Sequence, residues 1–389
     1  MSAAEVNRGE SVPTSFQAVP FSRTLWIDPD DPTRLRVIDQ RQLPHALSEL
    51  VLGTVEDVVE AIKEMAVRGA GCIGVTAAWG MYLAALQAHT LTLEEAWTFI
   101  TDSANSLVGS RPTAVNLSWA VTRQLNALRD LQSTDEFVAA AKEVATEITQ
   151  EDIVGCRKIG RHGLEIIREV HERKGSEVNI LTHCNAGWLA FVEYGSALAP
   201  IYAAHEAGIP VRVYVGESRP RSQGLLTAWE LQQAGVPHVY TADNASGNLL
   251  QEGKVDLVIV GADRVTSRGD VANKVGTYLR ALAARANDVP FYVAMPISTF
   301  DPDTFDGLVE IPIEEREGEE VTHVVVSDGE GAIRKALYVP GRTEVSNPAF
   351  DVTPAELVSA FITERGIVSA NELSLKAFAG HISPERSSE

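Results

Sequence analysis

Cysteine and long apolar runs are the first things that this chain lacks. Its 389 residues contain three cysteines, Cys72, Cys156 and Cys184, and no CxxC pair. An odd number of cysteines without that spacing argues against a disulfide framework and against a cysteine zinc site. No stretch reaches the roughly 18 uninterrupted apolar residues that a membrane-spanning helix needs, and residues 1–22 are polar without a hydrophobic signal core. The sequence therefore predicts a cytoplasmic protein that does not enter a membrane.

Positive charge is the second deficit. The chain has 33 lysines and arginines against 53 aspartates and glutamates, which gives a formal net charge of −20. A field of this sign repels nucleic acid and anionic lipid, so we expect no nucleic-acid partner and no membrane partner. A small anionic ligand would have to be held by a local cluster of cations.

Motifs for binding a cofactor are absent as well. The chain has no GxGxxG after a strand and no GxxxxGKS or GxxxxGKT, the glycine-rich loops that hold dinucleotides and nucleoside triphosphates. It has no HExxH, and its nine histidines lack the spacing of metal ligands. We therefore expect chemistry without a metal or another cofactor.

The residues that are present indicate an α/β protein of two domains. A length of 389 residues exceeds one ordinary core, and the hydrophobic content of 45% is sufficient for two. We predict a disordered lead at 1–22, a small, mostly helical N-terminal domain at 23–170, a Rossmann-like parallel-sheet domain at 171–370 and a C-terminal tail at 371–389. The N-terminal domain should include a small hairpin of 24–27 and 35–39 across a Pro-Asp-Asp-Pro turn.

The period of the apolar residues changes near residue 175. Before this point they recur at helical spacing, whereas afterwards short β-rich runs alternate with helix-like segments, which is typical of βα units around a parallel sheet. The predicted strands are 178–182, 211–215, 238–241, 255–260 and 291–294. The predicted helices lie near 188–207, 224–235, 272–287 and 354–365. The charged segment 314–342 is predicted to be an irregular excursion over the sheet, with a hairpin of 321–326 and 332–338.

Polar residues follow three of the predicted strands. The first strand ends in Thr182-His183-Cys184-Asn185, the second in an arginine-containing run from Glu217 to Gly224, and the fourth in Gly261-Ala262-Asp263-Arg264. Ligands bind beyond the carboxyl ends of the strands in an open parallel sheet, so these groups should face one cleft. Cys184 is a candidate nucleophile or acid, and Asp263 is a candidate acid with a raised pKa. The alternatives are a core cysteine and a helix-capping or salt-bridged aspartate.

Three further segments are suited to holding an anion. The sequence predicts that 269–277 opens a helix, so that backbone N–H groups would form a clamp with Asn273 and Lys274. Arg68 stands beside Gly69, and Arg111 stands beside a proline-directed turn, where a fork of donors could grip phosphate. The alternatives are a solvated helical turn and two surface arginines in salt bridges.

These and other motifs, spread over about Thr24 to Ile367, form a recognisable set. They are Asp39 to Pro44, Arg68-Gly69-Ala70, Arg111 to Leu117, Thr182 to Gly187, Gly261 to Arg264, Gly269 to Lys274 and Asn347 to Pro354. The set resembles the methylthioribose-1-phosphate isomerase family, aldose–ketose isomerases of methionine salvage. Its superfamily includes ribose-1,5-bisphosphate isomerases and regulatory subunits of the exchange factor of translation initiation.

The resemblance implies a fold, a reaction and a site. The fold is a small helical domain on a Rossmann-like domain, usually in a homodimer, and the reaction converts 5-methylthioribose 1-phosphate to 5-methylthioribulose 1-phosphate without a cofactor. Cys184 and Asp263 would be the catalytic pair. The residues implied to hold the sugar phosphate are Arg68, Gly69, Ala70, Arg111, Gln223, Asn273 and Lys274.

Two departures from the family pattern leave the substrate open. Gly71-Cys72 stands where the family usually has Pro-Ala, and the loop from Gln223 is one residue shorter, as in ribose-1,5-bisphosphate isomerases. Ribose 1,5-bisphosphate and 5-deoxyribose 1-phosphate are therefore alternative substrates. Arg221 could hold a second phosphate, but Gly71 and Cys72 add no positive charge, which favours an apolar C5 substituent. A non-catalytic regulatory module is a further alternative, although such a module has no physical reason to keep both Cys184 and Asp263.

Overall fold

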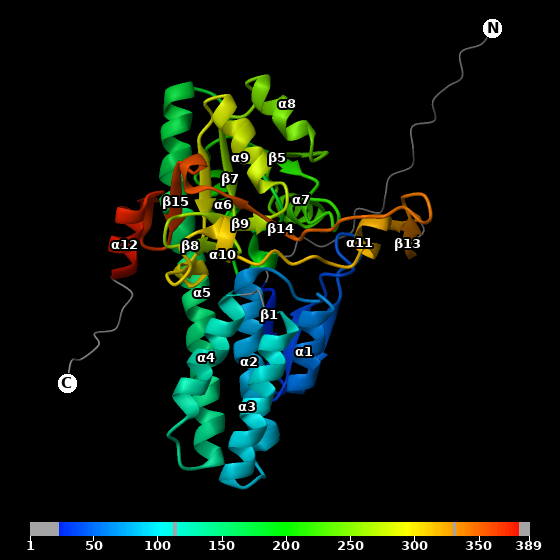
Figure 1. Ribbon diagram of the computed structural model, residues 1–389, viewed down its shortest axis with the longest axis vertical. Helices are drawn as coiled ribbons and strands as arrows, with labels where there is room; N and C mark the ends of the chain where they lie inside the picture. Colours follow the sequence, from blue (N-terminus) through cyan, green and yellow to red (C-terminus); the bar gives the residue numbers. More distant parts are fainter. Residues whose placement is uncertain (1–22, 112–114, 330–331, 381–389) are drawn as a thin grey trace.

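The computed structural model describes residues 23–111, 115–329 and 332–380, and it has a mostly helical end and a sheet-containing end (Figure 1). The disordered lead predicted at 1–22 lies outside the described residues.

A small antiparallel sheet and five helices form the helical end. The sheet has the order β1 (Leu25–Ile27), β2 (Leu35–Ile38), β3 (Glu49–Leu52), so the predicted hairpin is confirmed and β3 extends it. The helices are α1 (Val55–Lys63), α2 (Ala70–Ala88), α3 (Leu93–Ser110), α4 (Val115–Leu128) and α5 (Thr134–Lys174).

Helix α2 lies at the centre of the helical end and contacts each of the other four helices. Its residues are apolar on nearly every side and almost all of them are buried, as expected for a helix that others surround. By length and composition it is the one described helix that could cross a membrane, but 83% of its apolar window is buried inside the fold.

Helix α5 connects the two ends. It has 41 residues, with Ser133 as its N-cap and Gly175 in the left-handed conformation after its last residue. It contacts α2 and α4 at the helical end and α6 and β15 at the sheet end. Figure 1 shows it running along much of the length of the molecule. The predicted domain boundary at residue 170 falls near the C-terminal end of this helix.

The main sheet has seven strands in the order β16-β15-β10-β7-β4-β5-β6. All pairings are parallel except that of the edge strand β16. Read along the chain, the six parallel strands follow the Rossmann order 3-2-1-4-5-6, and the direction of winding reverses between β4 and β7. The predicted α/β class and Rossmann-like parallel sheet are therefore confirmed. The strands are β4 (Val178–Thr182), β5 (Val211–Gly216), β6 (His238–Thr241), β7 (Leu257–Val260), β10 (Phe291–Ala294), β15 (Ala360–Thr363) and β16 (Gly366–Ser369).

The part of the chain that contains the main sheet also contains helices and a second small sheet. The helices are α6 (Ala199–Glu206), α7 (Gly224–Gln233), α8 (Ala245–Gln251), α9 (Thr277–Ala286), α10 (Gly307–Glu310), α11 (Glu319–Thr322) and α12 (Glu372–Gly380), with short 3-10 turns η1 (Trp188–Ala190), η2 (Ile297–Thr299) and η3 (Ala355–Leu357). The second sheet has the order β11 (Phe300–Asp301), β8 (Arg264–Thr266), β9 (Val271–Lys274), β14 (Phe350–Thr353). The hairpin predicted in the charged segment is confirmed as β12 (His323–Ser327) paired with β13 (Ile333–Leu337).

Three of the predicted helical segments differ from the structure. The helix predicted at 272–287 begins only at Thr277, because 271–274 form strand β9 between β8 and β14. The helix predicted at 354–365 is a 3-10 turn followed by the fully buried strand β15. In 188–207 the helix α6 begins at Ala199, after the short turn η1. A short apolar run fits a buried strand as well as a helix, and periodicity alone does not separate the two.

The C-terminal segment predicted as a tail contains helix α12. Leu375 and Phe378 of this helix are buried, and the ring of Phe378 packs edge-on against Phe300.

Candidate active site

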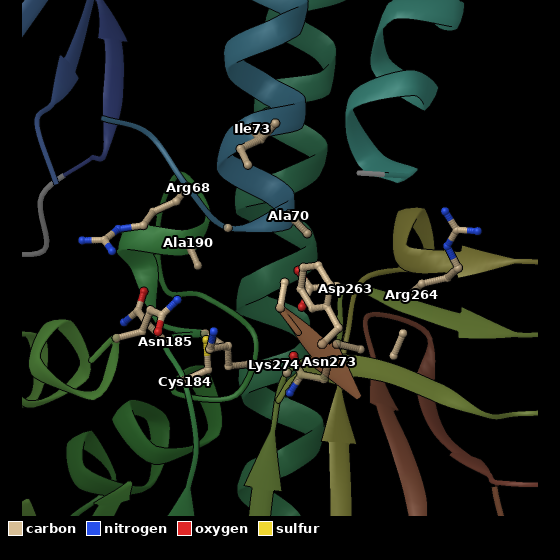
Figure 2. Close-up of a pocket in the computed structure, with 18 of the residues that line it drawn as sticks. Arg68, Ala70, Ile73, Cys184, Asn185, Ala190, Asp263, Arg264, Asn273 and Lys274 are labelled. Atoms are coloured by element: carbon tan, nitrogen blue, oxygen red, sulfur yellow. The ribbon is translucent and has the colours of Figure 1, made fainter. Parts of the chain in front are cut away.

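One pocket lies beyond the carboxyl ends of the main-sheet strands and contains every residue that the sequence proposed for the site. Strands β4 and β7 are neighbours, with Leu181 paired to Val258, and Cys184 and Asp263 follow them at the point where the winding reverses. This point is where ligands bind in doubly wound sheets. The proposed residues that line the pocket are Arg68, Gly69, Ala70, Arg111, Cys184, Gln223, Asp263, Asn273 and Lys274. Figure 2 shows Cys184, Lys274, Asn273 and Asp263 below the first turn of α2, with Asp263 to the right of Cys184 in this view.

The backbone of Cys184 is held in an uncommon conformation. Its φ is 63°, in the left-handed region that residues with a side chain rarely adopt. Two hydrogen bonds fix it there: the backbone N–H of Cys184 donates to Ser218 Oγ at 2.7 Å, and Thr227 Oγ1 donates to the Cys184 carbonyl at 2.7 Å. Burial and the nearby Asp263 carboxylate raise the pKa of the thiol to about 11, against the opposing effect of Lys274. The thiol is therefore neutral near pH 7.

His183 does not activate the neighbouring thiol, because both of its ring nitrogens are engaged elsewhere. Nε2 lies 2.9 Å from the Val275 carbonyl, which can only accept, so Nε2 carries the proton. Nδ1 then accepts from the Ser218 hydroxyl at 3.0 Å. Burial lowers the pKa of His183 to about 3, so the ring stays neutral. Through Ser218 the ring supports the Cys184 backbone.

Asp263 has the electrostatic surroundings of an acid that can be protonated near neutral pH. Its backbone N–H donates to the carbonyl of Ala272 in the adjacent strand β9 at 3.0 Å, which fixes the position of the residue. Burial raises the pKa of its carboxyl to about 6, although Arg111 and Lys274 act in the opposite direction. The alternative of a helix cap does not apply, since Asp263 precedes a strand.

Asn273 and Lys274 reach the pocket from a strand rather than from a helical turn. Strand β9 pairs with β14, which places Asn273 opposite Asp351 and Lys274 opposite Phe350. Both side chains are buried, so the alternative of a solvated turn is wrong. Burial lowers the pKa of Lys274, and this ammonium makes no ion pair with the described residues.

Three arginines line the pocket with N–H groups that have no partner among the described residues. Arg68 and Arg221 each have a buried Nε that donates no hydrogen bond within the described structure. The same is true of Nε and Nη1 of Arg111, and the buried acceptor Gln223 Oε1 likewise has no hydrogen-bond partner. Burial lowers the pKa of Arg68 to about 9, with Arg221 adding to the effect. Buried donors without partners are costly, and a phosphate group would satisfy several of them at once. Arg68 and Arg111 therefore line the pocket instead of forming surface salt bridges, although Arg111 Nη2 lies 3.9 Å from Glu314 Oε2.

Gly69 and Ala70 bring the start of helix α2 to the pocket. Gly69 has a φ of 92°, and a Cβ atom there would lie 2.4 Å from Ala190, so this close approach requires glycine. No side chain caps the helix start. The free N–H groups and the dipole at a helix N-terminus favour an anion, which agrees with the neighbouring arginines.

A sequence model described as the initiation factor 2 subunit family matches residues 66–370. The chain belongs to this family. Methylthioribose-1-phosphate isomerase of Gluconobacter oxydans is 51% identical over 359 residues, which cover 91% of this chain and 95% of the relative. The enzyme of the same name from Cereibacter sphaeroides is 51% identical over 364 residues, which cover 93% and 97%. The resemblance read from the motifs is therefore confirmed.

Solved structures of the family have the same fold. The crystal structure of 5-methylthioribose 1-phosphate isomerase from Pyrococcus horikoshii matches with a TM-score of 0.81 and 35% identity, over 94% of this chain and 98% of that one. The translation initiation factor eIF-2B subunit delta from A. fulgidus matches with a TM-score of 0.74 and 36% identity, over 91% and 99%.

The departure at Gly71 and Cys72 does not face the pocket. Neither residue lines it, and Cys72 is fully buried among the helices, with burial raising the pKa of its thiol to about 12. A Cβ atom at Gly71 would lie 2.3 Å from the ring of Phe191 and 2.6 Å from Asp152. Phe191 does line the pocket. Glycine at 71 therefore acts on the pocket indirectly, by allowing this ring to approach α2.

Sequence reasoning missed the residues that cover the pocket. Arg316 comes from the charged excursion 314–342, and Ile311 and Pro312 come from the segment just before it. Met65 and Phe191 come from the N-terminal half of the chain. Arg316 Nη2 lies 3.3 Å from Met65 Sδ, so the excursion reaches across to the segment just before Arg68. The sequence offers no local signal for these positions, because isolated apolar residues and charged loops occur on most protein surfaces.

Proposed function

We propose that this protein is an aldose–ketose isomerase that converts 5-methylthioribose 1-phosphate to 5-methylthioribulose 1-phosphate in methionine salvage. The observation that carries the proposal is the placement of Cys184 and Asp263 at the strand ends where the winding reverses, beside buried cations with unpartnered donors. The relatives named methylthioribose-1-phosphate isomerase, 51% identical to this chain, support the same substrate.

The proposed reaction begins with an acid. In a 1-phosphorylated aldose the anomeric oxygen is esterified, so the ring opens only when its oxygen is protonated. Asp263, whose pKa is about 6, donates this proton. One hydrogen then passes from C2 to C1, and the proton of the C2 hydroxyl returns to the Asp263 carboxylate. The residue is thereby restored to its starting form, and the ketose keeps its phosphate.

Cys184 acts as a neutral thiol in this proposal. A pKa of about 11 disfavours a thiolate base, whereas a thiol beside the C1–C2 bond can donate a weak hydrogen bond to the oxygen that develops charge. Its fixed backbone holds it at the end of β4, next to strand β7, which Asp263 follows. The residues that hold the sugar phosphate are Arg68, Gly69, Ala70, Arg111, Gln223, Asn273 and Lys274.

The proposal also includes the cofactor requirement, localisation, partners and oligomeric state of the protein. We propose that it works without a metal or another cofactor, in the cytoplasm, on a small-molecule substrate and without a nucleic-acid or membrane partner. We also propose a homodimer. Helix α9 supports this, because Tyr278, Leu279 and Leu282 lie on one of its faces and are 40%, 57% and 40% exposed. A contiguous exposed apolar face is typical of an association surface.

Turnover by the purified protein tests the proposal. The substrates are 5-methylthioribose 1-phosphate, 5-deoxyribose 1-phosphate and ribose 1,5-bisphosphate, the last because Arg221 lines the pocket. We expect the specificity constant to be highest for methylthioribose 1-phosphate. A preference for the bisphosphate would overturn the substrate but not the reaction, and no turnover of any of the three would leave only the regulatory binding module.

A further inference from the structure

Apart from Arg264, which pairs with Asp301, the cations that line the pocket fall into two sets that differ in how their charge is neutralised. Arg68 and Lys274 make no ion pair with the described residues, and the nearest carboxylate oxygen to Arg111 is that of Glu314 at 3.9 Å. Arg221 and Arg316, in contrast, are both paired with Glu320. The first set is open to a ligand, whereas the charge of the second set is already matched by a carboxylate of the protein, although Arg221 Nε has no hydrogen-bond partner in the described structure.

Glu320 is built into this second set on both of its oxygens. Oε1 accepts from Arg221 Nη1 at 2.7 Å and from Arg316 Nη2 at 2.8 Å. Oε2 accepts from Asn347 Nδ2 at 3.1 Å, and Asn347 is itself buried. The Glu320 side chain is 13% exposed. Burial alone would raise the pKa of Glu320, but Arg316 and Arg221 outweigh it and hold the pKa at about 2, so the group is always charged.

A second carboxylate of the same excursion has a similar position. Glu314 Oε1 accepts from Arg316 Nη1 at 2.7 Å, and Glu314 Oε2 is buried without a hydrogen-bond partner in the described structure. Arg316 of the excursion lines the pocket, and both carboxylates contact this arginine without lining the pocket themselves. Glu320 also occupies Nη1 of Arg221, which does line the pocket.

We propose that Glu320 is a specificity-determining residue that limits the pocket to substrates with one phosphate. This role of Glu320 rests on the proposed function. It excludes a sugar bisphosphate from the pocket although Arg221 lines the pocket. A second phosphate needs cationic donors of its own, and Glu320 both occupies the available arginine and repels a further dianion. An uncharged C5 substituent meets neither obstacle.

A purely structural role of Glu320 predicts a different outcome. If the residue only anchors the excursion over the pocket, its replacement would slow the turnover of all substrates by the same factor. If it sets the charge that the pocket accepts, its replacement would change the ratio between substrates. The ratio of two specificity constants measured on one preparation is independent of how much of the enzyme is folded.

The test is Glu320→Gln with two comparison variants. Glutamine keeps the shape and one acceptor oxygen but removes the charge. Glu320→Asp keeps the charge and disturbs the anchoring. Glu319→Gln is the matched control, because Glu319 is the adjacent residue, is exposed and pairs with Lys335 away from the pocket. For each protein, kcat/KM and the dissociation constant by calorimetry are measured with methylthioribose 1-phosphate and ribose 1,5-bisphosphate.

We expect Glu320→Gln to shift both ratios towards the bisphosphate by about tenfold or more, while the aspartate and Glu319 variants keep the wild-type ratios. Ratios for Glu320→Gln within about twofold of wild type would overturn the inference. Should Glu320→Gln fail to fold, Glu320→Met, which keeps the length of the side chain without its charge, carries the same test with the same criteria. A wild type that turns over neither sugar contradicts the proposed function, and the ratio of dissociation constants still decides the role of Glu320.

Discussion

Cys184 and Asp263 follow neighbouring parallel strands, and the negative charge of the Asp263 carboxylate adds to burial in raising the pKa of the Cys184 thiol. The Asp263 carboxylate therefore helps to keep the thiol protonated, whereas the neutral thiol carries no charge at the pH where Asp263 titrates. Each is also held by a different backbone contact: Ser218 supports Cys184, whereas Ala272 of strand β9 supports Asp263. Neither residue can take over the position of the other.

The first prediction follows from this arrangement. Asp263→Asn and Cys184→Ala should each lower kcat by about 10²–10⁴-fold or more, because general acid–base contributions have that size. Steady-state turnover of methylthioribose 1-phosphate measures this. A variant that keeps more than about a tenth of the wild-type rate loses only ~1.4 kcal/mol of barrier stabilisation, and its assignment would be wrong.

A stability measurement separates lost chemistry from lost folding in these variants. The folded-state pKa of Asp263 is about 6, above the value of 3.8 expected for an unfolded chain. The ionised group therefore destabilises the folded state, and the penalty grows in as the pH rises from about 4 to about 6. Asp263→Asn should unfold at or above the wild-type temperature at pH 8, and this advantage should disappear near pH 4.

The second prediction concerns the pH dependence of turnover. If the protonated form of Asp263 opens the ring, kcat at saturating substrate should fall as the pH rises through an apparent pKa at or above about 6. The bound phosphate adds negative charge and can only move this value upwards. The pH profile of kcat between about pH 5 and about pH 9 measures this apparent pKa. A rate that rises steadily over this range would show that the ionised form is the active one.

The third prediction concerns the arginines with unpartnered donors. Arg68→Lys and Arg111→Lys should each weaken phosphate binding by about tenfold or more, because an ammonium cannot reproduce a planar fork of donors. Calorimetric titration with the sugar phosphate measures the affinity. Arg123→Lys is the control, since Arg123 pairs with Glu147 and Glu151 outside the pocket. Equal affinity in all three variants would remove both arginines from the phosphate site.

The strand-end part of the site could be predicted from the sequence. Short β-rich runs identify parallel strands, parallel strands share their carboxyl edge, and polar residues at those ends must therefore meet. This reasoning placed Cys184 and Asp263 together without knowledge of any distance. The sequence pattern predicts that Lys274 lies at the start of a helix, but it lies in strand β9. Its location in the pocket is nevertheless as expected.

The rest depends on contacts between distant segments. Strand β9 exists because it pairs with β14, where Asn273 lies opposite Asp351, and such pairing leaves no trace in four residues of sequence. The same holds for Arg316, whose carboxylate partners and contact with Met65 become visible only in the folded chain. Local patterns therefore predict the elements, while the cover of the pocket is set by tertiary contacts.

The fourth prediction concerns the proposed homodimer. Leu279→Glu should convert a dimer to a monomer, because a charge at the centre of an apolar association surface must lose its hydration without gaining a partner. Light scattering coupled to size exclusion measures the mass. Leu373→Glu, at an 82% exposed position of α12, is the control and should leave the mass unchanged. Identical masses of wild type and both variants would contradict the α9 interface.

The last prediction concerns Glu230, a buried carboxylate that holds the loop after Cys184 in place. Its two oxygens accept from the backbone N–H groups of Trp188 and Leu189, from Asn185 Nδ2 and from the hydroxyl of Tyr202, at 2.8 to 3.2 Å. Burial raises the pKa of Glu230 to about 7, and these hydrogen bonds oppose the rise. All four partners donate, so the site requires a group that only accepts.

Glu230→Gln places an amide NH₂ where donors already point. At least one buried donor then loses its acceptor, so we expect the free energy of unfolding to fall by about 1–3 kcal/mol or more. We also expect a lower kcat, because Asn185 follows Cys184 directly and the thiol moves with the loop. Thermal unfolding and turnover of the same preparation measure the two effects, with the exposed Glu172→Gln as the control. A Glu230→Gln variant that matched the control in both would show that this carboxylate does not position Cys184.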